Sequence, residues 1–513
     1  MKKGGIIIWC FCILMILSCI IISSQKPMWL DELYSFYSTQ DSSLSHSIQG
    51  IANGVNAAPP FYFMLTWCFY KVGIHEILFY RMLSSICFIS ALILLWRLLR
   101  KYYDEAIVIG SVIICFGASN LIFAQNSEFR NYALFFLLES LALIQAVYLI
   151  EKPDSQLNLI LLAIFLGLGC LTHIFGVFYG MAFLASFIVY DLIQKKIQIK
   201  RWIACIAGTS FIIVWVNQII TQSQMGKPHS WIPVPDMGAG IETFSSLFPF
   251  GDRVNYQNHS TLLLIIFISI VSLTLYLLMR NSGRLVYKIR NIISASNERK
   301  FLGILSIAII LIPLVISYFL SRAFTSIFLL RYLIPSILGV LLLFINIFSL
   351  DNLFKPQLLR YVLPVLMILG FLRFGYSTLK YRDQNISSLA QVEARARAEK
   401  MSVIFQSPQF FMPFQYYFNS VRAYYPLDWK VASEPSNALC ATSDYKSMER
   451  LRNYYKISGV SNDDEIVKPG KVYYLVDEPG KIWLKYYLAQ KKASVLESHL
   501  LPNGFVLKKI VFN

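Results

Sequence analysis

Long apolar segments separated by short polar loops fill most of the first 380 residues of the chain. A helix needs about 20 mostly apolar residues to cross a bilayer, and because hydrocarbon offers backbone groups no water, we expect these segments to be helical. The pair 158–172 and 174–190 is open to two interpretations, as two short spans or as one kinked span. The eleven candidate spans are 5–24, 79–99, 106–123, 133–150, 158–172, 174–190, 202–220, 260–279, 301–320, 333–349 and 361–377.

One further apolar segment, 59–73, is short and opens with Pro59-Pro60. Lys and Arg gather on the inner side of membrane proteins, and here they mark residues 2–3, 97–101, 195–201 and 280–300. All of these basic loops fall on the inner side only if the segment 59–73 does not fully cross the membrane. We therefore expect it to lie along the outer surface or to re-enter the membrane, with the N-terminus inside and the C-terminus outside.

The composition changes near residue 378, where the chain becomes polar and mixed. In this part, alternating apolar positions are typical of strands, and apolar positions that recur every three to four residues are typical of helices. We expect an all-α polytopic membrane domain over 1–377, with its first outer loop at 25–78, followed by a small outer α/β domain over 378–513. In that second domain the expected strands are 402–405, 472–476 and 505–512, and the expected helices are 409–423, 445–456 and 481–491.

The overall composition agrees with a membrane protein. The chain is 56% hydrophobic and 15% charged, whereas soluble domains are about 25% charged. The net charge of +17 comes from basic residues in the short loops, which is typical of membrane topology and of contact with anionic lipids. We therefore expect no nucleic-acid partner. Cys440 is the one cysteine of the polar C-terminal part, so that part cannot hold an internal disulfide.

Polar residues with useful chemistry gather on the predicted outer face. Asp31-Glu32 follows the first span, Pro59-Pro60-Phe61-Tyr62 opens the short segment, and Glu128-Phe129-Arg130-Asn131-Tyr132 precedes the fourth span. His173 and Arg331-Tyr332 complete the set, and the cations Arg322 and Arg331 oppose the inward bias of positive charge. Carboxylates serve proton abstraction or metal binding, while Arg and His bind phosphate.

This mixture suits the transfer of a sugar from a polyprenyl phosphate. The lipid phosphate is already a good leaving group, so the site needs a base for the acceptor hydroxyl and cations for the departing phosphate. Each residue alone also has an ordinary explanation: a solvated loop for Asp31-Glu32, a turn for Pro59-Pro60, a membrane-surface anchor for Arg130 or Arg331, a helix end for His173. The hypothesis depends on all of them sharing one face.

The order of these motifs resembles that of the GT-C membrane glycosyltransferases, in the branch of protein O-mannosyltransferases and bacterial aminoarabinose transferases (family 39 type). The resemblance covers roughly residues 1–380 and is carried by five motifs in order, none of them specific alone. One motif departs from the family pattern, because Ala58 stands where relatives have a polar residue before the prolines. The motifs are Asp31-Glu32, Ala58-Pro59-Pro60-Phe61-Tyr62, Phe129-Arg130-Asn131-Tyr132, Leu171-Thr172-His173 and Arg331-Tyr332-Leu333-Ile334-Pro335.

The resemblance implies an inverting transfer from a polyprenyl-phosphate sugar donor to a glycan, lipid or protein acceptor. It gives Asp31 the role of base, with Glu32 assisting or orienting. Some relatives bind a divalent metal through a carboxylate before the proline motif, and since Ala58 stands there we predict no metal site, although metal dependence stays open. The remaining roles are lipid-phosphate binding for Arg130, His173, Arg331 and Tyr332, and weaker substrate contacts for Pro60, Tyr62, Glu128 and Tyr132.

These inferences place the protein in the bacterial inner membrane as a multi-pass protein, with the N-terminus cytoplasmic and the C-terminal domain periplasmic. That domain would guide the acceptor. Two alternatives remain open. A transporter or flippase of a lipid-linked sugar usually carries charges near the bilayer midplane and paired halves, whereas here the charges gather at one surface and no paired halves are evident. A ligase or polymerase would instead transfer an oligosaccharide from a diphosphate carrier.

Overall fold

The structure is a computed structural model that describes residues 3–225, 232–249, 251, 296–350, 368, 372, 375, 376, 379, 380, 384–433 and 441–513. Its internal contacts divide the chain into two units, each taken by itself below. The helical unit comprises Met1–Ile20, Ile77–Trp215 and Val234–Phe374. The sheet unit comprises Ile21–Glu76, Val216–Pro233 and Gly375–Asn513, so the first outer loop groups with the C-terminal domain.

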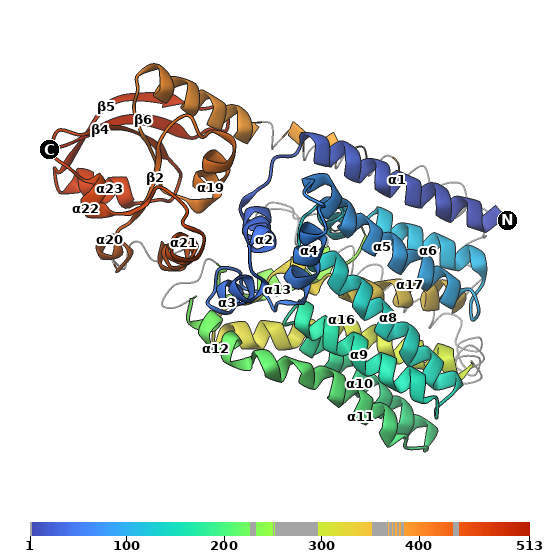
Figure 1. Cartoon of the computed structure of the whole chain (residues 1–513). Coiled ribbons are helices and arrows are strands. Elements are labelled where there is room, and N and C mark those ends of the chain that lie inside the picture. The colour runs from blue at the N-terminus through green and yellow to red at the C-terminus, as the bar shows by residue number, and fades with distance from the viewer. Residues whose placement is uncertain are drawn as a thin grey trace. The chain divides into compact units, whose positions relative to one another are not determined.

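The helical unit is a bundle of apolar helices around α8 (Tyr132–Glu151), which contacts α5, α9, α10 and α16 (Figure 1). Such all-round apolar helices are typical of membrane-embedded bundles. The other helices are α1 (Lys3–Gln25), α5 (Ile77–Leu99), α6 (Glu105–Gly117), α7 (Asn120–Gln125), α9 (Gln156–Thr172), α10 (Gly176–Gln194), α11 (Ile199–Thr209), α13 (Met237–Ser246), α16 (Asn297–Ala323) and α17 (Ser336–Leu350), with short 3-10 turns η1 (Ser210–Trp215) and η2 (Leu330–Leu333).

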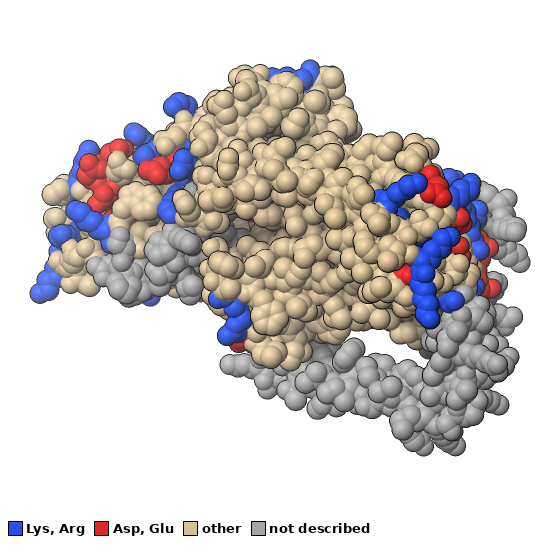
Figure 2. Space-filling model, turned by 90° about the horizontal axis from the view of Figure 1, so that it is seen from below, with Lys and Arg blue, Asp and Glu red and all other residues tan. Residues whose placement is uncertain are grey.

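Six helices of the described chain are long and apolar enough to cross a membrane, beginning with Gly4–Gln25 and ending with Asn297–Ala323. The surface agrees with this, because the helical unit shows a broad area without charged side chains and carries its Lys and Arg mainly near the end where α1 begins (Figure 2). The protein is therefore a multi-pass membrane protein.

Most predicted spans match helices. The segment 158–190 forms two helices, α9 and α10, separated by residues 173–175. The segment 106–123 was wrongly predicted as one helix, because Ser119 accepts a hydrogen bond from the Ile122 backbone N–H and so begins α7 as a new helix. The predicted span 260–279, nearly all of 361–377 and the basic run from 280 to 295 lie outside the described residues.

Glycine allows two helices of the bundle to approach closely. A Cβ atom on Gly208 of α11 would come within 2.6 Å of the Ala163 carbonyl oxygen and 2.9 Å of the Leu166 Cβ atom, both on α9. Small residues at such crossings let backbones approach, which is how helices pack in membranes. Gly303 of α16, in contrast, lies at an open position, since a Cβ atom there would meet nothing within 4 Å.

We predict that Gly208→Ala destabilises the purified protein by about 1–3 kcal/mol, the usual cost of overpacking a close contact. Gly303→Ala is its matched control, and helix propensity favours it by about 0.5–1 kcal/mol. Thermal unfolding in detergent measures both. Equal melting temperatures for the two variants would show that α9 and α11 do not pack at Gly208 as described.

The sheet unit contains a six-stranded mixed sheet in the order β3-β2-β1-β4-β6-β5, parallel from β3 to β4 and antiparallel beyond it. Ile404, Leu475, Trp483 and Phe512 lie in its buried core. The elements are β1 (Val403–Phe405), β2 (Ala423–Leu427), β3 (Val460–Asn462), β4 (Val472–Asp477), β5 (Ala493–Leu500), β6 (Val506–Phe512), α19 (Pro408–Tyr417), α20 (Trp429–Ser433), α21 (Ala441–Tyr455), α22 (Asp463–Ile466), α23 (Trp483–Ala489) and the helix 384–398.

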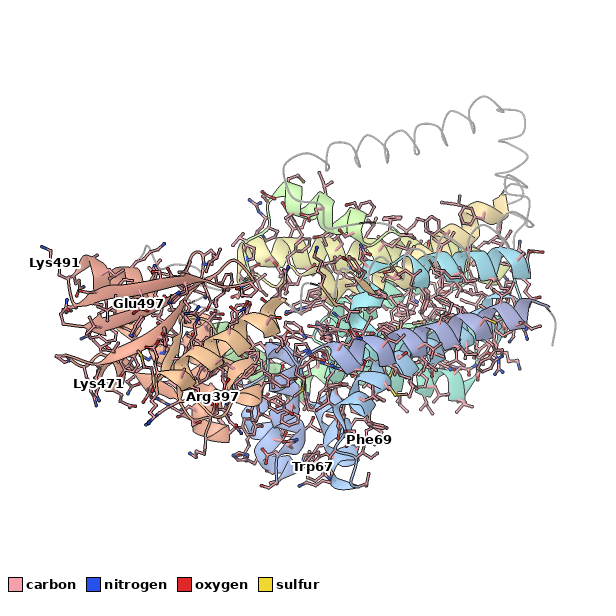
Figure 3. The ribbon with its side chains drawn as sticks, turned by 90° about the horizontal axis from the view of Figure 1, so that it is seen from above. Trp67, Phe69, Arg397, Lys471, Lys491 and Glu497 are labelled. Atoms are coloured by element: carbon pink, nitrogen blue, oxygen red, sulfur yellow. The ribbon has the colours of Figure 1, made fainter. Side chains whose placement is uncertain are left out.

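The strands predicted at 402–405, 472–476 and 505–512 correspond to β1, β4 and β6. The helix predicted at 409–423 is wrong at its end, because α19 stops at Tyr417 and β2 begins at Ala423. Tyr424 and Tyr425 favour extended structure, and Tyr425 is buried where β2 pairs with β1 and β3. Charged side chains such as Arg397, Lys471, Lys491 and Glu497 lie at the periphery (Figure 3).

The first outer loop forms three short helices of the sheet unit, α2 (Leu30–Gln40), α3 (Leu44–Ala52) and α4 (Phe61–Lys71), and α12 (Val216–Met225) packs beside α3 and α21. Trp67 and Phe69 mark α4 in Figure 3. At about 1.5 Å per residue, the 11 residues of α4 are too few to cross a hydrocarbon layer about 30 Å thick, so the segment 59–73 does not span as a helix.

Candidate functional site

Five predicted site residues of the helical unit lie together. Arg130 precedes α8, Tyr132 begins it, His173 follows α9, and Arg331 and Tyr332 lie on η2. The His173 ring is 4.8 Å from that of Tyr332 and 5.8 Å from that of Tyr132, centroid to centroid. The Tyr132 and Tyr332 rings stack at 6.2 Å. We call these five residues the cation–aromatic cluster.

The two guanidinium groups of the cluster approach the same aromatic ring. The Cζ atoms of Arg130 and Arg331 lie 5.8 Å and 6.0 Å from the centroid of Tyr132, within the range of cation–π contact. Arg130 and Tyr132 are buried, with 8% and 2% of their surfaces exposed, so water screens the positive charges poorly. Guanidinium groups suit phosphate oxygens geometrically, so the cluster is a candidate phosphate site.

His173 is uncharged although it lies beside two cations. Its burial, and then the charges of Arg130 and Arg331, lower its pKa from 6.5 to about 3. The backbone N–H of Phe175 lies 3.2 Å from Nδ1 and donates to it, which assigns the ring proton to Nε2. At neutral pH His173 therefore offers an uncharged N–H donor beside two cations, and a bound anion would raise its pKa.

Hydrogen bonds between helices hold the segments that carry the cluster. The Asn131 amide donates to the Thr172 carbonyl oxygen at 2.6 Å, which links the start of α8 to the end of α9. The Ser84 hydroxyl of α5 donates to the Glu128 carbonyl oxygen at 2.6 Å. Buried hydrogen bonds of this kind restrict the backbone, so we infer that the cluster is preorganised.

The carboxylate pair lies at the start of α2 in the sheet unit. Glu32 is fully buried, and its Oε2 atom accepts the backbone N–H of Trp29 at 3.4 Å, as a carboxylate does at the third position of a helix. Asp31 is half-buried. The two carboxylates thus differ, since Glu32 caps the start of the helix while Asp31 is partly exposed.

The other two predicted residues of the first loop, Pro60 and Tyr62, are buried at the start of α4. The hydroxyls of Thr39 and Thr66 are 2.8 Å apart and join α2 to α4. Pro60 and Tyr62 thus lie beside the helix that carries the carboxylates, and a direct substrate contact for them stays a prediction.

Tyrosines of the C-terminal domain hold the first loop. The Tyr417 hydroxyl accepts the Met28 backbone N–H at 2.7 Å, two residues before α2 begins. The Tyr37 ring of α2 stacks on Tyr455 at 6.0 Å, and the Asn53 amide donates to the Tyr454 hydroxyl at 2.6 Å. The position of Asp31 therefore depends on the C-terminal domain.

The carboxyl ends of the parallel strands carry polar residues, among them Gln406 after β1 and Glu478 after β4. Ligands of doubly wound domains bind at this edge, where the chain turns to opposite sides of the first strand. Glu478 is buried. Its burial, reinforced by Asp444 and Asp477 and opposed by Lys481 and Ser407, raises its pKa from 4.5 to about 8.

In the parts of the chain that the structure describes, no three His, Cys, Asp or Glu side chains are grouped so that they could hold a metal ion.

Comparison with known proteins shows which family and which solved structures the chain is similar to. Residues 57–220 match the family model described as dolichyl-phosphate-mannose-protein mannosyltransferase. The crystal structure of ArnT from Cupriavidus metallidurans bound to undecaprenyl phosphate aligns with a TM-score of 0.55 at 11% identity, over 99% of this chain and 98% of that one. Its apo structure aligns with the same score and coverage at 13% identity. No curated protein sequence matches the chain.

The chain has the GT-C fold. The expected polytopic fold with a small C-terminal sheet domain is thereby confirmed, and the family model supports the expected resemblance over residues 57–220. The individual site residues keep the status of predictions. Of these, the structure brings Arg130, Tyr132, His173, Arg331 and Tyr332 together in one unit, and it places Asp31, Glu32, Pro60 and Tyr62 together in the other.

The sequence interpretation missed Arg81, which lies near the start of α5 with 2% of its surface exposed. Ser84, one turn later on the same helix face, bonds to the Glu128 carbonyl, so this face of α5 lies against the segment that carries Glu128 and Arg130. A charged group inside an apolar span is costly and often functional. That signal, an arginine within the hydrophobic segment 79–99, was present in the sequence.

Glu139 is an exception to the gathering of charges at one surface. It lies inside α8 and is fully buried, and neither carboxyl oxygen has a hydrogen-bond partner among the described residues. Gly169 of α9 makes room for it, since a Cβ atom there would come within 2.6 Å of Glu139 Oε1. An ionisable residue inside the bundle of a GT-C fold is a second candidate for a functional group.

We predict a pH dependence of stability from Glu478. Because folding raises its pKa, the native state keeps a proton that the unfolded chain releases, and stability is lost as the pH rises from about 4.5 to about 8. Glu478→Gln removes this titration. At pH 8.5 the variant should have a higher melting temperature than the wild type, and its free energy of unfolding should be higher by up to about a few kcal/mol. Both differences should vanish near pH 4.5. Glu465→Gln, at an exposed site, is the control. Parallel melting curves for all three proteins would contradict the assignment.

Proposed function

We propose that the protein transfers a sugar, with inversion, from a polyprenyl-phosphate donor to a glycan, lipid or protein acceptor at the periplasmic face of a bacterial inner membrane. The observation that carries the proposal is the cation–aromatic cluster, with two arginines and a neutral histidine around Tyr132 in a GT-C fold. A structure of this fold binds undecaprenyl phosphate, which supports a lipid phosphate as the ligand.

The cluster acts on the leaving group. When the bond between the sugar C1 and the phosphate oxygen breaks, negative charge grows on the departing phosphate. Arg130 and Arg331 stabilise that charge through charge-assisted hydrogen bonds, and His173 donates from Nε2 without carrying charge itself. Because the cations are in place before the reaction, little reorganisation is needed as the charge develops.

Asp31 acts on the acceptor. It accepts the proton of the acceptor hydroxyl while that oxygen forms the new bond to C1, and attack opposite the departing phosphate inverts the anomeric centre. The products are the glycosylated acceptor, polyprenyl phosphate and protonated Asp31, which returns its proton to solvent. Glu32 remains buried as the cap of α2 and orients its neighbour.

The C-terminal domain has a positioning role in this proposal. Tyr417 and Tyr455 bind the segment that carries Asp31, through the hydrogen bond from Met28 and the stack with Tyr37. The domain would therefore set the position of the base as well as guide the acceptor.

We predict that Asp31→Asn lowers turnover by about 10²–10⁴, the range for loss of a general base. Arg331→Ala should lower it by about 10²–10³, as for loss of one electrostatic donor. Release of polyprenyl phosphate from a panel of labelled polyprenyl-phosphate sugars, with purified protein in detergent, measures both. Arg322→Ala is the control, because Arg322 is exposed at the end of α16 and donates to the Pro235 carbonyl.

The outcomes separate the competing hypotheses. If the Asp31→Asn variant kept the turnover of the wild type, the assignment of Asp31 as the base would be wrong. Turnover only with a diphosphate-linked oligosaccharide would favour the ligase or polymerase, and binding without turnover of either donor would favour the transporter.

A second prediction concerns positioning. Tyr417→Phe removes the acceptor of the Met28 N–H, a bond worth about 0.5–1.5 kcal/mol, so kcat should fall about three- to tenfold with little change in the donor KM. Tyr424→Phe, on β2 of the same domain, is the control. Equal kcat values for the two variants would show that the C-terminal domain does not position the base.

A further inference from the structure

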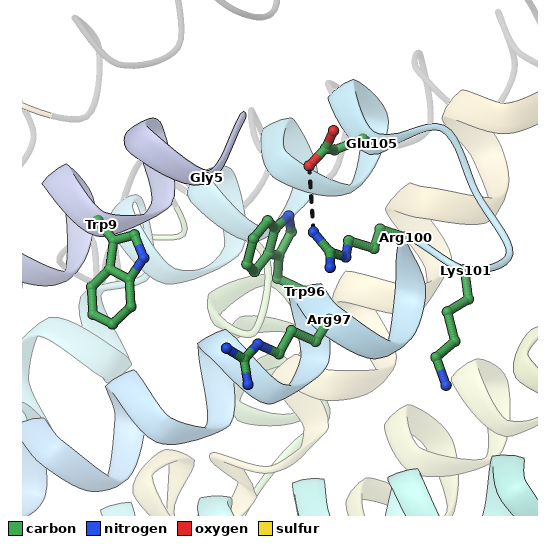
Figure 4. Close-up of a pocket in the computed structure, with 7 residues that line it drawn as sticks. All are labelled: Gly5, Trp9, Trp96, Arg97, Arg100, Lys101 and Glu105. Atoms are coloured by element: carbon green, nitrogen blue, oxygen red, sulfur yellow. Dashed lines mark ion pairs between the residues drawn. The ribbon is translucent and has the colours of Figure 1, made fainter. Parts of the chain in front are cut away.

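We infer a binding site for the headgroup of an anionic phospholipid in a pocket where α1, α5 and α6 of the helical unit meet. The pocket has a volume of about 670 Å³. It takes no part in the proposed transfer reaction, and the inference does not depend on that reaction. The described residues that line it are Gly5, Trp9, Trp96, Arg97, Arg100, Lys101 and Glu105 (Figure 4).

The lining has an excess of positive charge. Arg97, Arg100 and Lys101 line the pocket with one carboxylate, Glu105, so two positive charges remain in excess. The Arg100 Nη1 atom lies 3.9 Å from Glu105 Oε1, and the Arg100 Cζ atom lies 4.5 Å from the centroid of the Trp96 ring. Glu105 and Trp96 thus contact one cation. Arg97 and Lys101 are exposed and can reach an anion, and the Lys101 Nζ atom lies 4.9 Å from the centroid of the Tyr148 ring.

Trp96 supplies a second and independent indication of a ligand. The residue is 93% buried, with 7% of its surface exposed, and its indole Nε1–H has no hydrogen-bond acceptor among the described residues. The Nε1 atom points toward the place where Arg100 and Glu105 meet (Figure 4). A buried donor without an acceptor is unfavourable, and a phosphate oxygen in the pocket would satisfy it.

The surroundings favour a lipid over a soluble phosphate. Trp9 lines the pocket and is 46% exposed on α1. Ile6 and Ile13 of the same helix are also exposed, so the pocket adjoins apolar surface. Tryptophan is enriched at the headgroup level of membranes, and basic pockets between transmembrane helices bind anionic headgroups. A phospholipid would place its phosphate on the cations and its acyl chains along α1.

Native mass spectrometry of the purified full-length protein with phosphatidylglycerol and phosphatidylcholine tests the site. We expect phosphatidylglycerol to bind about tenfold more tightly, and Arg97→Gln/Lys101→Gln to abolish that preference. Trp96→Phe, which keeps the ring and removes the N–H, should weaken phosphatidylglycerol severalfold. The control is Lys152→Gln/Lys196→Gln, which removes two exposed cations of other loops.

Three results would overturn the inference. Equal loss of preference in the control and in Arg97→Gln/Lys101→Gln would show a diffuse effect of charge. An unchanged preference in Arg97→Gln/Lys101→Gln would place the lipid elsewhere. Displacement of phosphatidylglycerol by glycerol phosphate at an equal concentration would identify a site for a soluble phosphate.

Discussion

Two like charges held against one buried tyrosine are the constraint on which the candidate site depends. Arg130 and Arg331 come from segments about 200 residues apart, and both contact Tyr132. Bringing two cations to one ring requires the helices to hold both segments in place. The bond from Asn131 to the Thr172 carbonyl oxygen contributes to this.

The site residues of the helical unit could be predicted because their chemistry conflicts with their surroundings. Arg130, His173 and Arg331 stand at the ends of apolar segments, on the side predicted to be the outer one, where cations are disfavoured. Their mutual contacts could not be predicted in the same way, since ring stacking depends on how α8, α9 and η2 pack. Arg81 could not be recognised in this way, because it lies inside the apolar segment 79–99 and not at its end.

The sheet unit shows where local patterns fail. Long alternating strands such as β6 were predictable, whereas β2 was not predicted, and the helix expected at 409–423 ran into its first residue, Ala423. The contacts of the first loop with the C-terminal domain could not be predicted from the sequence either. The contacts of Met28 with Tyr417 and of Asn53 with Tyr454 join residues separated by 389 and 401 positions, and no periodicity encodes such pairings. They link the C-terminal domain to the position of Asp31.

The most direct test of the central claim is the affinity of the purified protein for undecaprenyl phosphate, measured by titration in detergent for the wild type, Arg331→Gln and Arg322→Gln. A hydrogen bond to a charged group is worth about 1.5–3 kcal/mol, so Arg331→Gln should bind about ten- to a hundredfold more weakly, while Arg322→Gln should bind as the wild type does. Equal affinities for Arg331→Gln and the wild type would contradict the assignment of the cation–aromatic cluster as the lipid-phosphate site.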